Sequence, residues 1–461
     1  MLTAKDPLNL RIAYIGGGSR GWAWGFMNDI AMDAEICGTV SLYDIDREAA
    51  NRNQKIGTMI SENPKALSRW KFEVADTLPE ALKNADFIVI SILPASFDEM
   101  ESDVHAPEAF GIYQSVGDSI GLGGFMRAVR TLPMYRVIAE AIRDYAPDAW
   151  VINYTNPMSL CVRTLYEVFP GVHAFGCCHE VFGTQKLLCS MLATEHGVFG
   201  VTRQDLYTTV IGINHFTWLS SASWQSNDLM PLYREFADKY AESGYMDGKD
   251  DNWMNNTFTC AHRVKFDLFR RFGLIAAAGD RHLAEFMPRD YLTDPETVRK
   301  WMFGLTTVAW RKEDLKKRLA RSDRLLSGEE EALSTNGSGE EGHLLLKALL
   351  GLRTMISNVN IPNMGQIENL PRGAIVETNA VFTQNRISPV MAGALPDSLR
   401  PIIARHVDNQ ENTLKAILTG DRELAFRTFM NDPQMILDEK DGRVLFDKML
   451  DNQRPYLPKG F

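Results

Sequence analysis

A glycine-rich turn lies near the start of the chain, where Gly16, Gly18 and Gly21 satisfy the pattern G-x-G-x-x-G. In such a turn the first glycine permits a tight bend, the second lets the backbone approach a pyrophosphate, and the third lets a helix pack closely on a strand. Asp44 ends the next apolar stretch, where a carboxylate can accept hydrogen bonds from ribose hydroxyls. This spacing predicts a dinucleotide-binding site.

The expected dinucleotide contacts come from this turn and from the ends of neighbouring apolar stretches. They are Gly16, Gly17, Gly18, Ser19, Arg20, Gly21, Asp44, Asp46 and Asn153. Asp44 favours NAD, whereas Arg47 leaves room for the 2′-phosphate of NADP. We therefore expect NAD, with NADP as the alternative. The structural alternative is an empty tight turn with Asp44 as a strand-end cap.

Cys178 and His215 each follow a short apolar stretch, at 172–175 and 206–211. A thiolate and an imidazole at two strand ends can bind a divalent metal together and leave positions open for substrate oxygens. The sequence around them lacks the paired C-x-x-C spacing of a structural zinc site. The alternative is an ordinary buried cysteine and a hydrogen-bonded histidine.

Short apolar stretches alternate with amphipathic ones over roughly the first two hundred residues. Strands are expected at 10–15, 39–44, 86–93, 150–153, 172–176 and 206–211, with helices at 22–32, 48–60, 127–145 and 158–169. This alternation predicts an α/β fold with a Rossmann-like, doubly wound parallel sheet. Ligands of such sheets bind beyond the carboxyl ends of the strands. We therefore expect the glycine turn, Asn153, Asn156, Cys178 and His215 to form one composite site.

The second half of the chain is richer in helix. Helices are expected at 263–272, 298–310, 315–326, 341–357 and 404–418. This pattern predicts a mixed α+β lobe folded against the first one. We expect an NAD-binding domain over residues 1–200 and a helix-rich substrate and oligomerisation domain over 201–461.

Composition limits the partners and the compartment. The 461 residues carry 49 Lys and Arg against 59 Asp and Glu, a net charge of −10, which argues against nucleic-acid binding. The sequence has no apolar run of about 18 residues for a membrane span and no signal peptide at its start. The 6 cysteines include an adjacent pair, a poor disulfide framework. We therefore expect a cytoplasmic protein without a membrane partner.

Four motifs occur in a characteristic order: GGGS at 16–19, NYTNP at 153–157, GCCHE at 176–180 and GINH at 212–215. Together they resemble glycoside hydrolase family 4, and the similarity runs from about residue 10 to the C-terminus. The longer runs IYQSVGDSIGLGG, INYTNPMSLC, FGCCHEVFGTQKLL and AAGDRHLAEF are similar to the Bacillus-type α-galacturonidase branch.

The resemblance implies a redox-neutral hydrolysis that begins as a dehydrogenation. NAD would take a hydride from sugar C3, the C2 proton would then be removed, and the glycosidic oxygen would leave by elimination. Water would add to the unsaturated sugar, and the hydride would return. A divalent metal, expected to be Mn²⁺, would bind the C2 and C3 oxygens and stabilise the developing charge.

The resemblance also implies roles for single residues. Cys178 and His215 would be metal ligands, and His179 would be the general acid for the leaving group. His179 further implies unphosphorylated α-glycosides as substrates. Asp280 would be the base. Its structural alternative is the N-cap of the helix that follows.

Substrate contacts are expected from Asp118 and Asn156, and from Arg281 and His282. The uronate carboxylate needs a cationic partner, for which Arg281, His282 and Arg127 are the candidates. As alternatives, Asp118 is a turn residue and Asn156 is a helix N-cap before a proline.

The resemblance therefore implies an exo-acting α-galacturonidase that releases terminal galacturonate from short oligogalacturonides. The resemblance favours a homodimer or homotetramer. An α-glucuronidase or α-galactosidase of the same family is the alternative activity. A hydroxy-acid dehydrogenase and a non-catalytic NAD-binding protein are the alternatives outside it.

Overall fold

A computed structural model describes residues 5–246 and 260–461. Two lists give its helices and strands. The first runs β1 (Leu10–Ile15), α1 (Trp22–Ala31), β2 (Gly38–Tyr43), α2 (Arg47–Glu62), β3 (Trp70–Val74), α3 (Leu78–Leu82), β4 (Phe87–Ile90), α4 (Phe97–His105), α5 (Gly121–Tyr145), β5 (Trp150–Asn153), α6 (Met158–Val168), β6 (His173–Gly176) and α7 (Glu180–His196).

The second list begins with a hairpin. It runs β7 (Leu206–Ile213), β8 (Phe216–Trp224), β9 (Asn227–Asp228), α8 (Met230–Tyr240), α9 (Arg263–Phe272), β10 (Ile275–Ala276), α10 (Asp280–Phe286), α11 (Pro288–Tyr291), α12 (Pro295–Lys300), α13 (Val308–Ser327), α14 (Gly342–Leu349), β11 (Met355–Pro362), β12 (Ile375–Thr383), β13 (Arg386–Pro389), α15 (Arg400–Thr419), α16 (Arg422–Met430) and α17 (Glu439–Asp451).

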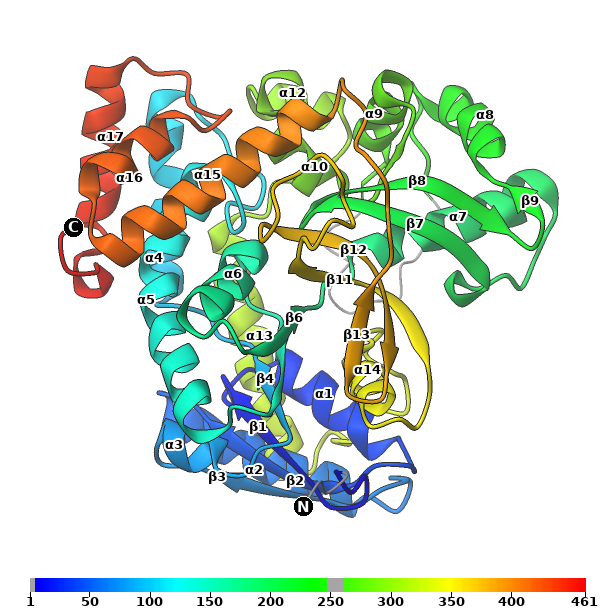
Figure 1. Ribbon diagram of the computed structural model, residues 1–461, viewed down its shortest axis with the longest axis vertical. Helices are drawn as coiled ribbons and strands as arrows, with labels where there is room; N and C mark the ends of the chain where they lie inside the picture. Colours follow the sequence, from blue (N-terminus) through cyan, green and yellow to red (C-terminus); the bar gives the residue numbers. More distant parts are fainter. Residues whose placement is uncertain (1–4, 247–259) are drawn as a thin grey trace.

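The main sheet has nine strands in the order β13-β12-β11-β6-β5-β4-β1-β2-β3 (Figure 1). The strands from β6 to β3 in this order are parallel, and β11, β12 and β13 join them antiparallel. The predicted α/β class with a Rossmann-like parallel sheet and a helix-rich second lobe is confirmed. Because β11–β13 come from the second half of the chain, one sheet crosses residue 200, and the domain division there stays a prediction.

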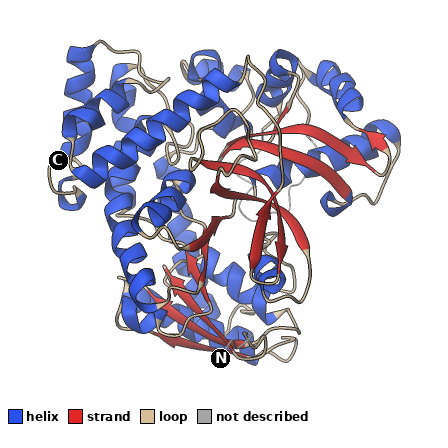
Figure 2. Ribbon diagram, viewed as in Figure 1, coloured by secondary structure: helices blue, strands red, loops and turns tan. Residues whose placement is uncertain are grey.

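Helices cover both faces of the parallel strands (Figure 2). In β1, Leu10, Ile12 and Tyr14 join a core with α1 and α2, whereas Ala13 and Ile15 join a core with α3, α5 and α6. Successive side chains of a strand point to opposite faces, so the apolar residues on both sides of β1 bury both faces of the sheet. The carboxyl ends of the strands are left as the accessible edge.

A smaller antiparallel sheet, β10-β8-β7 with β9 beside β8, belongs to the second lobe. The backbone N–H of Val210 in β7 donates to the side chain of Asn379 in β12 at 2.8 Å, so the two sheets touch. The β7–β8 hairpin turns through Asn214 and His215. The hairpin tip therefore carries a predicted site residue to the main sheet.

The helix predicted at 298–310 is wrong, because α12 ends at Lys300 and α13 begins at Val308. Met302 has a φ of 57°, which no helical residue adopts. The side chain of Thr307 accepts a hydrogen bond from the N–H of Trp310 and so caps a new helix.

The helix predicted at 341–357 is also too long. Helix α14 ends at Leu349, Gly351 has a φ of 84°, and β11 begins at Met355. A glycine in the left-handed region after a helix is a common stop signal. Seven strands were not predicted: β3, β8, β9, β10, β11, β12 and β13.

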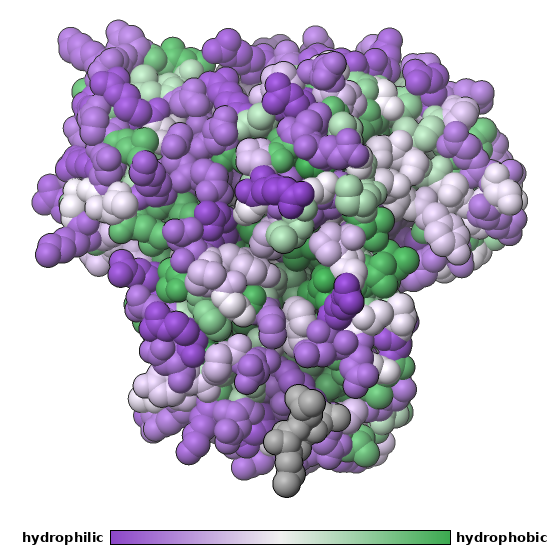
Figure 3. All heavy atoms as spheres, viewed as in Figure 1, coloured by the Kyte–Doolittle hydropathy of each residue, from purple (hydrophilic) through white to green (hydrophobic). Residues whose placement is uncertain are grey.

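Hydrophilic side chains cover most of the face seen in Figure 3, with hydrophobic ones in patches near its middle. Among the described residues, no helix is both long and apolar enough to cross a membrane.

Candidate functional site

The glycine turn lies between β1 and α1 and touches the strand beside it. Gly16 has a φ of 93°, and a Cβ there would collide with the carbonyl oxygen of Ser91, so only glycine fits. Gly18 donates its N–H to Oδ2 of Asp44 at 2.8 Å. A Cβ on Gly18 would lie 2.9 Å from that oxygen and 2.7 Å from Cβ of Ala49. The turn and Asp44 are therefore in direct contact.

Helix α1 starts directly after this turn. Its N-cap, Gly21, has no side chain to satisfy the first N–H groups, and its first turn carries no acidic residue. Such a helix N-terminus attracts an anion through its N–H groups and its dipole. The turn, the helix N-terminus and Asp44 fit the pyrophosphate and ribose of a dinucleotide.

Three other predicted dinucleotide residues have partners within the protein. Asp46 caps α2 by accepting from the N–H of Ala49 at 3.0 Å, and it lies 3.5 Å from Arg20. Asn153 accepts from the hydroxyl of Tyr135, and its amide donates to neighbouring acceptors. Contacts of these residues with a dinucleotide stay predictions.

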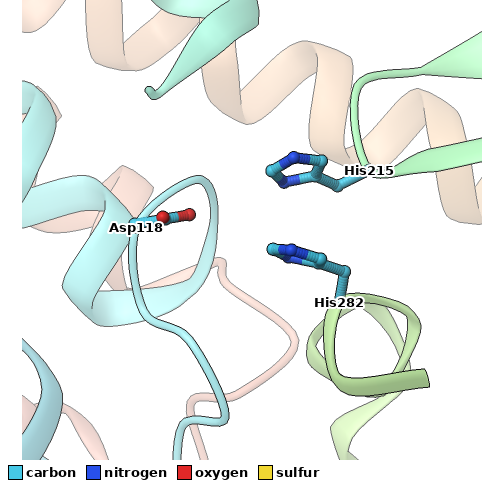
Figure 4. A group of neighbouring side chains, drawn as sticks. All are labelled: Asp118, His215 and His282. Carbon is cyan, nitrogen blue, oxygen red and sulfur yellow. The ribbon is translucent and has the colours of Figure 1, made fainter. Parts of the chain in front are cut away.

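Asp118, His215 and His282 come together beyond the sheet edge (Figure 4). Asp118 precedes α5, His215 sits at the tip of the β7–β8 hairpin, and His282 lies on α10. Each offers a ligand atom within 4.8 Å of the other two, and all three are buried. Nδ1 of His282 is buried and has no hydrogen-bond partner among the described residues. A carboxylate and two imidazoles are a donor set that fits a divalent metal such as Mn²⁺.

The two histidines are held in a strained and neutral arrangement. His215 has a φ of 63°, which costs free energy in a residue with a Cβ. Its ring lies 3.9 Å from that of His282 between centroids, and its Nδ1 lies 3.0 Å from Oγ of Ser119. Burial lowers the pKa of His215, and burial together with His215 lowers the pKa of His282 well below its ordinary value. Neutral imidazole is the form that binds metals.

Three arginines surround Asp118. Burial alone would raise the pKa of Asp118, but Arg127 and Arg311, followed by the two histidines, hold it below its ordinary range. Nη2 of Arg311 lies 4.0 Å from Oδ2 of Asp118. Arg281 lies beside the cluster, 3.5 Å from Nε2 of His282. Arginine side chains therefore lie around Asp118 and His282, although the whole chain is acidic.

Cys178 lies at the end of β6 and outside the Asp118–His215–His282 cluster. Burial raises the pKa of its thiol well above the ordinary value, and Glu377 and Glu180 add to the effect. Its carbonyl accepts from the amide of Asn358 in β11 at 3.3 Å. The amide of Asn214, the residue before His215, donates to Glu377 at 3.2 Å, and Glu377 also accepts from Asn358 at 2.7 Å. The cysteine loop and the hairpin tip are thus neighbours, as one composite site requires.

His179 and Glu180 follow Cys178, and they contact the segment before α14 and the start of α10. Nδ1 of His179 lies 3.0 Å from Oε1 of Glu340. Burial opposes the protonation of His179, but Glu340 outweighs it and raises the pKa. Glu180 accepts from the N–H of Gly279 at 2.7 Å and lies 3.4 Å from Nη2 of Arg281. A histidine paired with a carboxylate can deliver a proton.

Asp280 is fully buried at the start of α10 and faces another helix. Its carboxylate accepts from the N–H groups of Val264 and Lys265 in α9, at 3.1 and 3.2 Å. Burial, with Cys260, raises its pKa to about 7. The N-cap of α10 is Gly279, so Asp280 does not cap the helix that follows. It anchors the N-terminus of α9 instead.

The peptide bond between Asn156 and Pro157 is cis, and the backbone oxygen of Asn156 accepts from Nε of Arg127 at 3.0 Å. Pro157 is the N-cap of α6, so Asn156 is not. The arginine thus links the loop after β5 to the charged surroundings of Asp118.

Sequence reasoning missed four residues of the site. These are Glu180, Arg311, Glu340 and Glu377. Glu180 stands in the GCCHE motif, but the other three lie in segments without a recognisable pattern. Only the folded chain brings them to the motifs.

Two family models match the chain. The model for family 4 glycosyl hydrolases matches residues 11–194, and the model for the C-terminal domain of the same family matches residues 210–435. An α-galacturonidase of Thermoanaerobacterium saccharolyticum is 58% identical over 450 residues, 97% of each chain. An α-galacturonidase of Bacillus subtilis is 51% identical over 441 residues, 96% of this chain and 97% of that relative.

Solved structures agree with this assignment. The crystal structure of Bacillus subtilis lplD, described as a glucosidase, superposes with a TM-score of 0.91 at 50% identity and covers 96% of this chain and 99% of its own. A 6-phospho-α-glucosidase from gut microorganisms, solved with NAD and Mn²⁺, shares the fold with a TM-score of 0.80 at 20% identity, over 98% of this chain and 99% of its own. The chain therefore belongs to glycosyl hydrolase family 4 and is a glycoside hydrolase.

Proposed function

We propose that this enzyme is an exo-acting α-galacturonidase that hydrolyses terminal α-linked galacturonate from short oligogalacturonides. The observation that carries the proposal is the buried Asp118–His215–His282 cluster, ringed by arginines, in a chain 58% identical to an α-galacturonidase. A cationic, metal-competent site suits a sugar that bears a carboxylate.

The glycine turn, α1 and Asp44 would hold NAD, and His215 with Cys178 would hold the metal. His282 and Asp118, proposed as substrate contacts, also lie close enough to His215 to complete the metal site. When bound, NAD supplies a hydride acceptor for sugar C3 and the metal supplies Lewis acidity at the C2 and C3 oxygens. With both groups bound the C2 proton would be acidic, and the side chains of the protein would orient the sugar and move protons.

His179 is the proposed general acid for the glycosidic oxygen. Its contact with Glu340 holds the ring in place and favours the protonated form. Asp280 is the proposed base, with a pKa raised to about 7. Because α9 occupies its carboxylate, Asp280 can reach a substrate only after local rearrangement.

A panel of p-nitrophenyl α-glycosides tests the activity. The galacturonide, glucuronide and galactoside are offered with NAD⁺ and Mn²⁺ under reducing conditions. The proposal predicts the highest kcat/KM with the galacturonide and loss of turnover when NAD⁺ or Mn²⁺ is omitted. A preference for the glucuronide or the galactoside would show that the enzyme is an α-glucuronidase or an α-galactosidase instead. Net NADH production would indicate a dehydrogenase.

The proposal includes a cytoplasmic location and a homodimer or homotetramer. The described cysteines are all free thiols, which suits a reducing compartment. Light scattering on the purified enzyme tests the assembly, and a monomer at working concentration would contradict it.

A further inference from the structure

Arg311 lies in the first turn of α13 with its guanidinium turned to the cluster. Nη2 is 4.0 Å from Oδ2 of Asp118, too far for a direct hydrogen bond. Nε of Arg311 is buried and has no hydrogen-bond partner among the described residues. A buried donor without a partner costs free energy, so a ligand that accepts from it gains affinity.

The other two arginines of the site are already engaged by the protein. Arg281 lies 3.4 Å from Oε1 of Glu180, and Arg127 donates from Nε to the backbone oxygen of Asn156 at 3.0 Å. The first contact holds Arg281 of α10 to the start of α7, and the second holds Arg127 of α5 to the loop after β5. In Arg311, the Nε–H still lacks an acceptor among the described residues.

The guanidinium of Arg311 is a partly buried cation whose ion-pair partner, Asp118, lies 4.0 Å away, beyond hydrogen-bond distance. A ligand carboxylate beside Nε would supply both the missing acceptor and a closer counter-charge.

We propose that Arg311 binds the C5 carboxylate of the terminal galacturonate and so sets the preference for uronides over neutral sugars. This inference rests on the proposed α-galacturonidase function. The planar guanidinium presents Nε–H and Nη–H in parallel, the pair that a carboxylate accepts in a bidentate contact. The sequence favoured Arg281, His282 and Arg127 for this role, and the contacts of Arg281 and Arg127 leave Arg311 as the better match.

The test replaces Arg311 and compares ligands that differ only in charge. The NAD⁺- and Mn²⁺-loaded enzyme is inhibited by D-galacturonate and by D-galacturonamide, its neutral carboxamide, with p-nitrophenyl α-galacturonide as substrate. The wild type should favour galacturonate. In Arg311→Gln this preference should fall by about 10-fold to 100-fold, since hydrogen bonds to charged groups contribute roughly 1.5–3 kcal/mol. Arg311→Lys keeps the charge but loses the paired N–H donors of the guanidinium. Its preference for galacturonate should lie between that of the wild type and that of Arg311→Gln.

Lys316→Ala on the same helix is the matched control, because this lysine side chain is 75% exposed. It should keep the wild-type preference and melting temperature. A merely structural role for Arg311 would weaken both inhibitors equally or lower only the melting temperature, and either result would overturn the inference. A wild type that hydrolyses no galacturonide would overturn the proposed function itself, and the inference with it.

Discussion

Burial and function oppose each other at Cys178. The buried thiol has a pKa well above its ordinary value, yet only a thiolate is a good metal ligand. A bound cation would reverse this preference, because it stabilises the thiolate directly. The residue is therefore expected to be protonated in the metal-free enzyme and ionised in the loaded one.

Replacing Cys178 by serine tests this assignment. We expect Mn²⁺ affinity to fall by more than about 100-fold, since outer-shell partners alone contribute 10- to 100-fold. NAD⁺ affinity should stay unchanged, because the glycine turn is intact. Calorimetric titration of each ligand measures both. Cys189→Ser on α7 is the control, and unaltered Mn²⁺ binding and turnover in Cys178→Ser would refute the assignment.

Asp280 has one proposed catalytic and one observed structural role, and Asp280→Asn separates them. If Asp280 is the base, kcat should fall by about 100-fold or more, in addition to the lower melting temperature that follows when Asn leaves one of the two α9 N–H groups without its acceptor. Asp294→Asn removes a comparable anchor, since Asp294 accepts from the N–H groups of Glu296 and Thr297 in α12. Full activity in Asp280→Asn, with a melting temperature as low as in this control, would leave Asp280 only as the anchor of α9.

The residues of the site could be found from motifs, but their grouping could not. His215 was predicted from a strand-end position, Asp118 from the family resemblance, and His282 from its place beside a motif. Nothing in the sequence shows that the centroids of the two histidine rings lie 3.9 Å apart or that Arg311 lies 4.0 Å from Asp118. Such contacts depend on tertiary packing between α5, α10 and α13.

At the scale of elements, the β1–α1 turn allows a sharp test. In Gly18→Ala the new Cβ would crowd Ala49 and the Asp44 carboxylate, so the ribose-binding acid must shift. We expect NAD⁺ affinity to fall by at least about 10-fold, since the charge-assisted hydrogen bonds of the acid contribute roughly 1.5–3 kcal/mol. Fluorescence titration with NADH measures it. Gly183→Ala on α7 is the control, because nothing lies within 4 Å of its new Cβ. Unchanged affinity in Gly18→Ala would contradict the turn's role.

The periodicity of apolar residues predicted helices and strands correctly where that periodicity is regular. The alternation of apolar residues gave β1 at 10–15 and α9 at 263–272 with the observed bounds. The helix predicted at 341–357 is too long because its second part is β11, in which apolar and polar residues alternate. Pairing of β11 with β12 and β6 makes this segment a strand. Tertiary pairing of this kind is invisible in a local window.

For the whole molecule, the main sheet joins strands from both halves of the chain. Asn360 of β11 pairs with Gly176 at the end of β6, directly before the cysteine loop. The second lobe therefore shapes the site from within the same sheet. This arrangement could not be predicted from the division near residue 200.

The stability of the whole chain should depend on pH through His406. Burial lowers its pKa to about 3, and its ring packs against Phe286 at 4.9 Å between centroids. Below about pH 6.5 His406 binds a proton in the unfolded chain but not in the native state, so the free energy of unfolding decreases as the pH falls. Between pH 6.5 and pH 5 the loss should reach about 2 kcal/mol.

Urea unfolding of the wild type and His406→Gln at pH 7 and pH 5 measures this effect. The variant, which cannot take up the proton, should lose about 2 kcal/mol less than the wild type over this interval. An identical pH dependence in both proteins would show that His406 makes no such contribution.

The central claim is that this enzyme releases galacturonate through removal of the C2 proton. Proton NMR of the galacturonate that it releases from p-nitrophenyl α-galacturonide in D₂O, with NAD⁺ and Mn²⁺ present, tests it most directly. The account predicts galacturonate that carries deuterium at C2, because solvent returns a proton to that carbon after the elimination. Galacturonate that keeps its original C2 hydrogen, or no galacturonate at all, would contradict it.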